Sequence, residues 1–273
     1  MDNFSVLPEG CISQILSMTS PRDACRSSAI SSGFGAAANS DSVWEKFLPS
    51  DYRQIISRSV SPVVFFSTKK QLYFSLCDSP LLLDGGKLSF ALDRESGKKC
   101  FTLPARELAI PWKEDPRLWK WISLPESRFS EVAQVVGVCW LNIWRRISTA
   151  MLSPKTTYAA YLIFKFTVQK RHYGLESLPV KASVRFVKEG EDGYEDDNSS
   201  IVFLTLQTLA NLDRGQNGWL PQMREEGWME IELGEFYNDE GDDGEVEMRL
   251  REISDWKSGL IVEGIEVRPK VGV

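Results

Sequence analysis

A period of two in hydrophobicity is the strongest constraint on the fold, and it governs the second half of the chain. Apolar and polar residues alternate in five segments: 161–168, 181–188, 229–233, 245–250 and 265–268. Such alternation is typical of strands with one face on a core and the other in solvent. Short runs at 136–140 and 201–206 add candidate strands, and no amphipathic helix separates these segments. The pattern predicts about seven or eight antiparallel strands in a β-sandwich or jelly roll and disfavours a parallel α/β fold.

Residues 1–50 carry short helical signatures instead. After Pro8, apolar residues recur at helical spacing: Ile12, Ile15 and Leu16. The segment 20–23, Ser-Pro-Arg-Asp, offers an N-cap, a proline at the first helical position and an acid in the first turn. A capping box at 42–45 opens another predicted helix, which Pro49 ends. About three such helices would barely hold together alone.

The middle of the chain mixes both patterns. Thr68 begins a predicted helix that Pro80 ends. Apolar runs at 81–83 and 88–92 flank the turn sequence Asp84-Gly85-Gly86, which is typical of two short strands. Three regions follow from these changes of pattern: helices at 1–50, a mixed bridge at 51–104 and a β-rich domain at 105–273.

Charge limits the classes of partner. The chain has 32 basic and 38 acidic side chains and a formal net charge of -6, whereas a protein that binds nucleic acid through its phosphates needs an excess of cations. The N-terminal residues lack the pattern of a signal peptide, and no apolar run approaches the ~20 residues that cross a bilayer. We therefore expect no nucleic-acid partner, no membrane and a location in the cytoplasm or nucleus.

Side chains for metal or covalent chemistry are sparse. The five cysteines are scattered without a C-x-x-C pair and the single histidine is His172, so a disulfide framework, a zinc site and a histidine-based active site all fit poorly. The acidic run 239–245 lacks the ligand spacing of an EF-hand and is more typical of a solvated loop. Acids such as Glu245 and Glu252 could be drawn into a glycosidase mechanism, but nothing fixes their separation. We expect no catalytic residue, no metal and no cofactor.

Tryptophan is abundant, with nine in 273 residues, and three of them lie close together: Trp112, Trp119 and Trp121. Prolines and charges surround them, which suits loops better than a helix or a central strand. Two interpretations stay open. Trp119 or Trp121 can fill one end of the sandwich core, which residue types alone favour, or exposed indoles can form a platform for the apolar face of a sugar ring. Three other indoles are predicted to be structural: Trp140, Trp228 and Trp256.

Residues 5–49 resemble a plant-type F-box. The resemblance lies in three runs: 7–16 (LPEGCISQIL), 20–25 (SPRDAC) and 42–44 (SVW). An F-box is a trio of helices that docks on the adaptor subunit of a cullin-based SCF ubiquitin ligase. The resemblance implies that the adaptor covers part of an apolar set: Leu7, Pro8, Ile12, Ile15, Leu16, Val43 and Trp44. The alternative is that these side chains pack on the bridge at 51–104.

Residues 105–270 resemble the phloem protein 2 family, which includes the tobacco lectin Nictaba. The shared runs are 105–112 (ARELAIPW), 140–143 (WLNI), 157–165 (TYAAYLIFK), 227–236 (GWMEIELGEF), 244–253 (GEVEMRLREI) and 256–269 (WKSGLIVEGIEVRP). The resemblance implies a lectin that recognises N-acetylglucosamine oligomers and the cores of N-glycans. It places the carbohydrate-binding residues at four positions: Trp112, Trp119, Glu245 and Glu252. The sugar-platform interpretation of the indole cluster is therefore favoured.

Together the two resemblances imply a fold class that is mainly β, with an N-terminal α-helical F-box and a lectin-like antiparallel β-sandwich. They imply a non-catalytic substrate receptor of an SCF ubiquitin ligase, whose helices bind the adaptor and whose sandwich captures a glycan or glycoprotein. The alternative is an F-box adaptor that recognises a protein surface without binding carbohydrate, and a glycosidase is less favoured still. The loop 207–222 lacks the basic run of the tobacco lectin, so nuclear entry would need another route. A role in stress or defence is implied by analogy alone.

Overall fold

The computed structural model describes residues 7–61, 66–167, 173–175, 178–187, 199–204, 219–224 and 227–270. The chain forms two compact units, Met1–Phe101 and Thr102–Val273, and each has its own buried core. His172 and most of the loop 207–222 lie outside the described residues. The structure therefore does not test the predictions made for them. The three-part division of the sequence stays a prediction.

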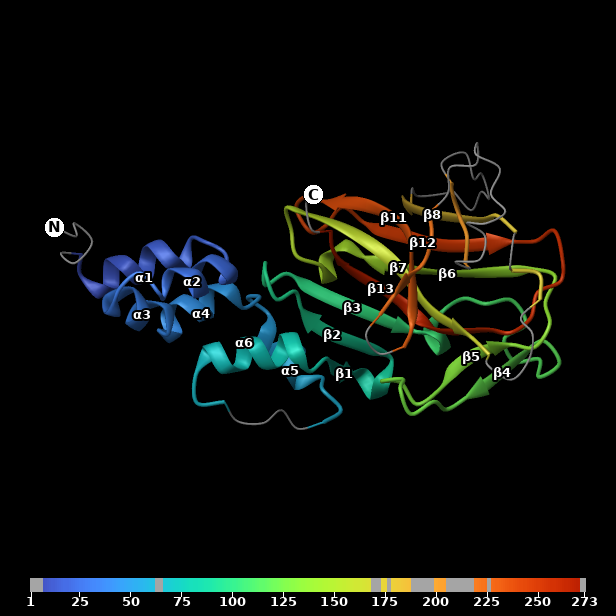
Figure 1. Ribbon diagram of the computed structural model, residues 1–273, viewed down its shortest axis with the longest axis horizontal. Coiled ribbons are helices and arrows are strands. Elements are labelled where there is room, and N and C mark those ends of the chain that lie inside the picture. Colours follow the sequence, from blue (N-terminus) through green and yellow to red (C-terminus); the bar gives the residue numbers. More distant parts are fainter. Residues whose placement is uncertain are drawn as a thin grey trace. The chain divides into compact units, whose positions relative to one another are not determined.

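The first unit begins with short helices, drawn in blue to cyan in Figure 1. Their bounds are α1 Glu9–Ser17, α2 Pro21–Ser27, α3 Ser32–Ala38, α4 Asp41–Phe47, α5 Tyr52–Ser57 and α6 Lys69–Asp78. The predicted N-cap at Ser20 and the predicted helix start at Thr68 are confirmed. The Ser20 hydroxyl accepts a hydrogen bond from the Asp23 N–H at 3.1 Å, and the Thr68 hydroxyl accepts one from the Gln71 N–H at 3.2 Å. Each hydroxyl satisfies a backbone donor that the first helical turn leaves unpaired.

The capping box predicted at 42–45 is wrong in register. Ser40 precedes α4 and caps it, because its hydroxyl accepts a hydrogen bond from the Ser42 N–H at 3.4 Å. The sequence does not predict α3 or α5. The sequence of α3, SGFGAAA, contains two glycines that weaken a helical signal, and α5 is only 6 residues long.

Trp44 lies at the centre of the first unit's core. Its side chain is fully buried, and its ring centroid lies 5.5 Å from that of Phe47, 5.1 Å from Tyr73 and 5.2 Å from Phe74. The indole N–H donates to the Ala38 carbonyl at 2.7 Å. Because Tyr73 and Phe74 belong to α6, these contacts pack α4 on α6.

A small antiparallel hairpin follows the helices. β1 Leu81–Leu83 pairs with β2 Leu88–Leu92. Between them Asp84, Gly85 and Gly86 have φ angles of 52°, 70° and 87°, and glycine adopts this left-handed conformation without strain. The turn predicted from Asp-Gly-Gly is therefore confirmed. The next strand, β3 Lys99–Pro104, runs through the boundary between the two units.

The second unit, called the sandwich unit below, contains two antiparallel sheets. In the first sheet β13 (Leu260–Pro269), β7 (Thr156–Phe166), β11 (Met229–Asn238) and β10 (Gln222–Met223) lie in this order. The start of β13 also pairs with β5 (Val132–Val135), which pairs with β4 (Trp119–Ile122). The second sheet has the order β6 (Leu141–Ser148), β12 (Glu245–Glu252), β8 (Val180–Phe186) and β9 (Ser200–Val202).

The two sheets pack together through aromatic side chains. Phe186 of β8 lies edge-on to Phe236 of β11, with ring centroids 6.0 Å apart, and Phe236 stacks on Tyr158 of β7 at 5.9 Å. Figure 1 shows β6, β12 and β8 grouped in one layer of this unit. The predicted antiparallel β-sandwich, mainly β with helices at the N-terminal end of the chain, is confirmed.

Several strands are buried on both faces, whereas the sequence predicts one solvated face. Every residue of β13 from Leu260 to Val267 is buried, and so is Glu247 in β12. The buried acids of these strands have hydrogen-bond donors. Glu263 accepts one from the Ser127 hydroxyl at 2.9 Å, and arginines surround Glu247 and Glu266. Alternation thus reports which side chains share a face, and it does not report whether that face meets water.

The predicted strand at 136–140 is wrong. The chain leaves the sheet between β5 and β6 at these residues, and Val138 makes only an isolated bridge to Lys257. Trp140, predicted to lie in the core, is 41% exposed, and Trp256 is 55% exposed. Trp228 is buried as expected, within a cluster that also contains Val132, Ile163 and Ile261.

Candidate functional site

The apolar F-box set divides into an exposed part and a buried part. Leu7, Pro8 and Ile15 are exposed, with Ile15 at 50%. Four members are buried in the first unit: Ile12, Leu16, Val43 and Trp44. Trp44 packs on the bridge residues Tyr73 and Phe74, which is the packing that the alternative interpretation expects. Only the exposed part of the set is accessible to a partner in this conformation.

Trp112 stands on a firmly held turn. Its side chain is 59% exposed and its φ angle is 54°, which is strained for a bulky residue. The Asp115 N–H donates to the Trp112 carbonyl at 2.9 Å, and Lys113 donates to the carbonyls of Arg106 and Leu108 at 2.8 and 3.2 Å. The turn therefore presents an indole to solvent at a backbone conformation that the surrounding contacts must maintain.

The Trp119 side chain, in contrast to that of Trp112, is buried. It is 1% exposed in β4, opposite Val135 in β5, and its indole nitrogen has no hydrogen-bond partner among the described residues. The interpretation in which Trp119 fills the core is the one that the structure matches. No ligand can stack on this ring in the present conformation, although the resemblance assigned it to the sugar site.

Glu245 and Glu252 lie at opposite ends of β12. With a rise of about 3.4 Å per residue, seven steps separate them by roughly 24 Å. Glu245 is exposed. Glu252 is buried and paired with Lys257, and it accepts a hydrogen bond from the Ser254 N–H at 2.7 Å. The structure therefore does not bring the four residues assigned by the resemblance into one site.

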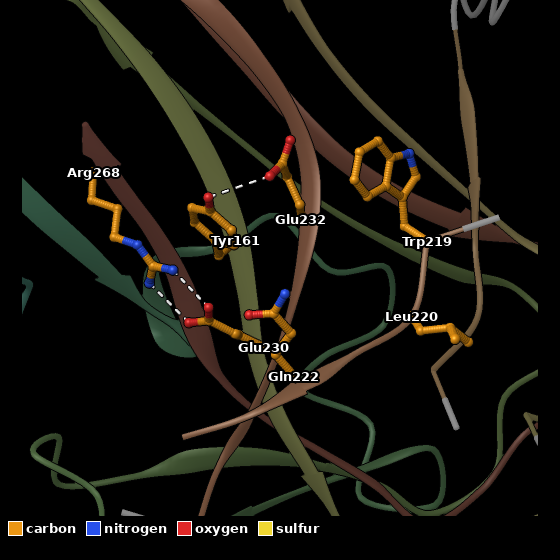
Figure 2. Close-up of a pocket in the computed structure, with 7 residues that line it drawn as sticks. All are labelled: Tyr161, Trp219, Leu220, Gln222, Glu230, Glu232 and Arg268. Atoms are coloured by element: carbon orange, nitrogen blue, oxygen red, sulfur yellow. Dashed lines mark hydrogen bonds and ion pairs between the residues drawn. The ribbon is translucent and has the colours of Figure 1, made fainter. Parts of the chain in front are cut away.

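A groove that the sequence analysis missed lies beside Trp219, and Figure 2 shows its lining. One cavity of about 100 Å³ is lined by Tyr161, Trp219, Leu220, Gln222, Glu230, Glu232 and Arg268. An adjoining cavity of about 340 Å³ shares Trp219 and Glu232 and extends along β8 and β11 to Lys270. The available signal was the alternation at 229–233, which places Glu230 and Glu232 on one face.

Glu230 and Glu266 are embedded in arginines next to this groove. Arg268 donates to both oxygens of Glu230 at 2.6 and 2.8 Å and to Glu266 at 3.2 Å. Arg224 donates to the same two carboxylates at 3.0 and 2.7 Å. The Arg268 guanidinium also lies 3.8 Å from the centroid of the Tyr161 ring. A network of this kind holds side chains in fixed positions, since each charge is satisfied by more than one partner.

Acid should destabilise the sandwich unit. Burial acts to raise the pKa of Glu247, Glu252 and Glu266, but the hydrogen bonds and charges of their partners outweigh burial, and each pKa lies below the ordinary 4.5. A carboxyl whose pKa is lower in the folded chain stabilises the fold above its unfolded pKa, and this stabilisation is lost as the pH falls through the folded value. Glu263 acts in the opposite direction, because burial raises its pKa, and it opposes the three carboxyls named above.

We therefore expect the melting temperature of the sandwich unit to fall once the pH drops below about 4.5. Calorimetric scans of the full chain between about pH 7 and pH 3 check this expectation. A melting temperature that stays constant or rises on acidification would contradict it.

Family comparison supplies the identity of the sandwich unit. The family model described as phloem protein 2 matches residues 98–269. The chain belongs to the phloem protein 2 family. Putative F-box protein PP2-B12 of Arabidopsis thaliana is 46% identical over 270 residues, which cover 98% of this chain and 98% of that protein. F-box protein PP2-B10 of the same plant is 44% identical, over 97% of this chain and 94% of that protein. Because both align along the helices as well as the phloem protein 2 domain, the chain is an F-box member of the family.

The solved structures to which this chain is similar are distant. A family 35 carbohydrate-binding module from Clostridium thermocellum is 13% identical with a TM-score of 0.33, over 62% of this chain and 96% of that module. The CBM22-1 xylan-binding domain of Paenibacillus barcinonensis Xyn10C is 10% identical with a TM-score of 0.30, over 61% of this chain and 87% of that chain. In the described part of the chain, no helix combines the length and apolar character that crossing a bilayer requires.

Proposed function

We propose that this protein is the substrate-recognition subunit of an SCF ubiquitin ligase, acting in the cytoplasm or nucleus. Its helices bind the adaptor subunit and thereby the cullin core, and its sandwich unit captures a glycoprotein or glycan that contains N-acetylglucosamine. The chain makes and breaks no bond. Its contribution is to raise the local concentration of the target's lysines at the ligase.

The exposed apolar side of α1 carries the adaptor part of this proposal. Ile15, on the same helix as the buried Ile12 and Leu16, is turned to solvent, and Leu7 and Met18 near the two ends of α1 are exposed as well. Three exposed apolar side chains around one short helix are unfavourable in water unless a partner covers them. The F-box relatives support the same assignment, since they align over nearly the whole chain.

Substituting Ile15→Asp should weaken adaptor binding at least about thirtyfold, because it places a charge in the centre of an apolar interface. The measurement is the affinity of the purified full chain for the adaptor subunit, by calorimetry or biolayer interferometry. Val60→Asp is the matched control, since Val60 is also exposed in the first unit but lies outside the F-box resemblance. If the unmodified chain binds the adaptor and Ile15→Asp binds it equally well, the adaptor surface proposed on α1 is refuted.

The glycan part of the proposal is supported by the exposed indoles of the sandwich unit, Trp112 among them. Carbohydrate-binding surfaces commonly use an aromatic face for the apolar side of a pyranose and polar groups for its hydroxyls. Affinity for a single sugar should be weak, because a small exposed contact leaves little free energy after the entropy of binding is lost.

A second candidate function is recognition of a protein surface by the sandwich unit. One observation favours it: exposed apolar side chains gather where the segments 136–140, 173–175 and 253–259 meet. Backbone bridges join Val138 to Lys257 and Tyr173 to Ser258, and the exposed members are Val136, Trp140, Tyr173, Ile253 and Trp256. A folded chain that binds the adaptor but no glycan would favour this candidate.

A further inference from the structure

The geometry points to the groove beside Trp219 as a binding site for neutral oligosaccharides, separate from the Trp112 turn. This inference rests on the glycan part of the proposed function and gives that function a location that neither resemblance assigns. The groove combines an accessible indole, a carboxylate with remaining acceptor capacity and cations that are already paired.

Trp219 is an accessible ring on a fixed backbone. Its side chain is 57% exposed. Its N–H donates to the Ile201 carbonyl at 3.1 Å, and its carbonyl accepts from the Phe203 N–H at 2.9 Å, so the residue is tied to the edge of β9. Figure 2 shows the indole standing across the groove from Tyr161, with the Glu232 carboxylate between them. Because this backbone is fixed, only the side-chain rotamers of Trp219 lose freedom when a ligand stacks on the ring.

Glu232 is placed to accept hydrogen bonds from hydroxyl groups. One of its oxygens accepts from the Tyr161 hydroxyl at 3.3 Å and the other from Lys270 at 3.0 Å. Each carboxylate oxygen can accept a further hydrogen bond. Glu230 differs, because Arg224 and Arg268 already donate three hydrogen bonds to it. Glu230 therefore acts as part of the framework, and Glu232 is the acceptor that a ligand can use.

The charges around the groove select against anions. The described charged side chains that line the groove are Glu230, Glu232, Glu235, Arg268 and Lys270. Glu266 and Arg224 adjoin them through ion pairs, which gives four carboxylates and three cations in all. Every one of these cations pairs with at least two of the carboxylates. A carboxylate or sulfate on the ligand would meet a net negative surface and would have to break an existing ion pair. A hydroxyl-rich neutral ligand has no such penalty.

The two adjoining cavities favour a ligand longer than one ring. They share Trp219 and Glu232, so the indole borders both a space of about 100 Å³ that Tyr161 lines and one of about 340 Å³ that residues of β8 line. Gln222 lies in the smaller space, and its amide can donate to and accept from ring substituents. One short oligosaccharide can thus place a sugar ring in each of the two spaces.

The test uses the purified full chain and a glycan array that contains chitotriose, other neutral oligosaccharides and their sialylated or sulfated counterparts. Titration of the best neutral ligand then compares four variants. Trp219→Ala removes the stacking ring, Glu232→Gln keeps the shape but removes the charge, and Trp112→Ala tests the other indole. Trp256→Ala is the matched control, because it deletes an equally exposed indole in another loop.

We expect Trp219→Ala and Glu232→Gln each to weaken the neutral ligand at least about tenfold, which is the loss of one aromatic or charge-assisted contact. Trp256→Ala should leave the affinity unchanged. The melting temperatures of the three tryptophan variants should agree with that of the unmodified chain, because each indole is more than half exposed. The Glu232 side chain is 18% exposed and paired with Lys270, so Glu232→Gln is titrated at a temperature at which it is fully folded. Preference for an acidic glycan over its neutral counterpart would overturn the charge argument.

Two negative results have different meanings. Binding that survives Trp219→Ala but is lost in Trp112→Ala would overturn this site and leave the proposed glycan function intact. A folded chain that binds no glycan on the array would overturn both the site and the glycan function. The adaptor measurement with Ile15→Asp would still decide the ligase part on its own.

Discussion

Replacing Lys257 with methionine should lower the free energy of unfolding of the sandwich unit by about 3–5 kcal/mol. The Lys257 side chain is fully buried and pairs with the buried Glu252. It also donates to the Cys139 carbonyl at 2.9 Å and to the Asp255 carbonyl. Methionine fills similar space but leaves the Glu252 carboxylate without its cation, and an uncompensated buried charge is far more costly than a lost surface contact.

Equilibrium denaturation of the full chain measures this loss, and Lys155→Met is the matched control. Lys155 also contacts two carboxylates, those of Asp239 and Glu240, but its side chain is 56% exposed. Solvent screens such pairs, so the control should unfold nearly as the unmodified chain does. Equal losses in the two variants would contradict the argument that burial makes the Lys257 pair important.

The pH dependence of the free energy of unfolding of Lys257→Met provides an independent test of this argument. In the unmodified chain the pKa of Glu252 is lowered, because hydrogen bonds from Lys257 and Ser254 outweigh the effect of burial. Without the cation, burial favours the protonated carboxyl, so acid neutralises the unpaired charge. The difference in stability between variant and unmodified chain should therefore shrink as the pH falls from about 7 to about 4.5. A difference that grows on acidification would contradict the assignment.

This result also bears on Glu252 as a sugar ligand. The resemblance links Glu252 to binding, whereas the structure shows a buried carboxylate with Lys257 and Ser254 as partners. A substitution at Glu252 that abolishes glycan binding would therefore indicate a binding role only if the sandwich unit keeps its stability.

Local signals allowed much of the fold to be predicted. The strands at 229–233, 245–250 and 265–268 follow from alternation, and the starts of α2 and α6 follow from Ser20 and Thr68, because each signal depends on neighbouring residues alone. The two wrong predictions, the capping box at 42–45 and the strand at 136–140, also come from relying on local signals. Several serines near α4 can cap a helix, and an apolar run beside Gly137 can leave a sheet as readily as join it.

Burial could not be predicted, because it depends on what packs against a strand from elsewhere in the chain. Glu266 belongs to an alternating segment and is expected to face water, but Arg224 and Arg268 cover it. Trp112 and Trp119 lie seven residues apart in a segment of uniform composition, but Trp112 is exposed and Trp119 is buried. The difference comes from β4 pairing with β5, which places Trp119 in the sheet.

The candidate site was the least predictable part. The groove joins Tyr161 of β7, Glu232 of β11 and Arg268 of β13 with Trp219, which is tied to β9. These residues come from four separate segments, and only the order of strands in the two sheets brings them together. Alternation could show that Glu230 and Glu232 share a face, but nothing local shows that an indole from the other sheet's edge stands beside them.

Trp44→Ala should cost the first unit about 3–5 kcal/mol, which is a large share of the stability of an ordinary domain. It removes a fully buried indole from between Phe47, Tyr73 and Phe74 and leaves the Ala38 carbonyl without its donor. Hydrogen exchange of α4 and α6 in the full chain measures the effect. Protection should fall in both helices, while the strands of the sandwich unit keep theirs.

The same variant separates two roles for Trp44, which the F-box resemblance assigns to the adaptor and the structure assigns to the core. We expect adaptor affinity to be lost in both Trp44→Ala and Ile15→Asp, but exchange protection of α4 and α6 to be lost only in Trp44→Ala. Trp44→Phe should restore most of the protection and the affinity together, since a smaller ring still fills much of the cavity. If Trp44→Ala keeps its protection and still loses the adaptor, Trp44 contacts the adaptor directly, and the helices must open in the complex to expose it.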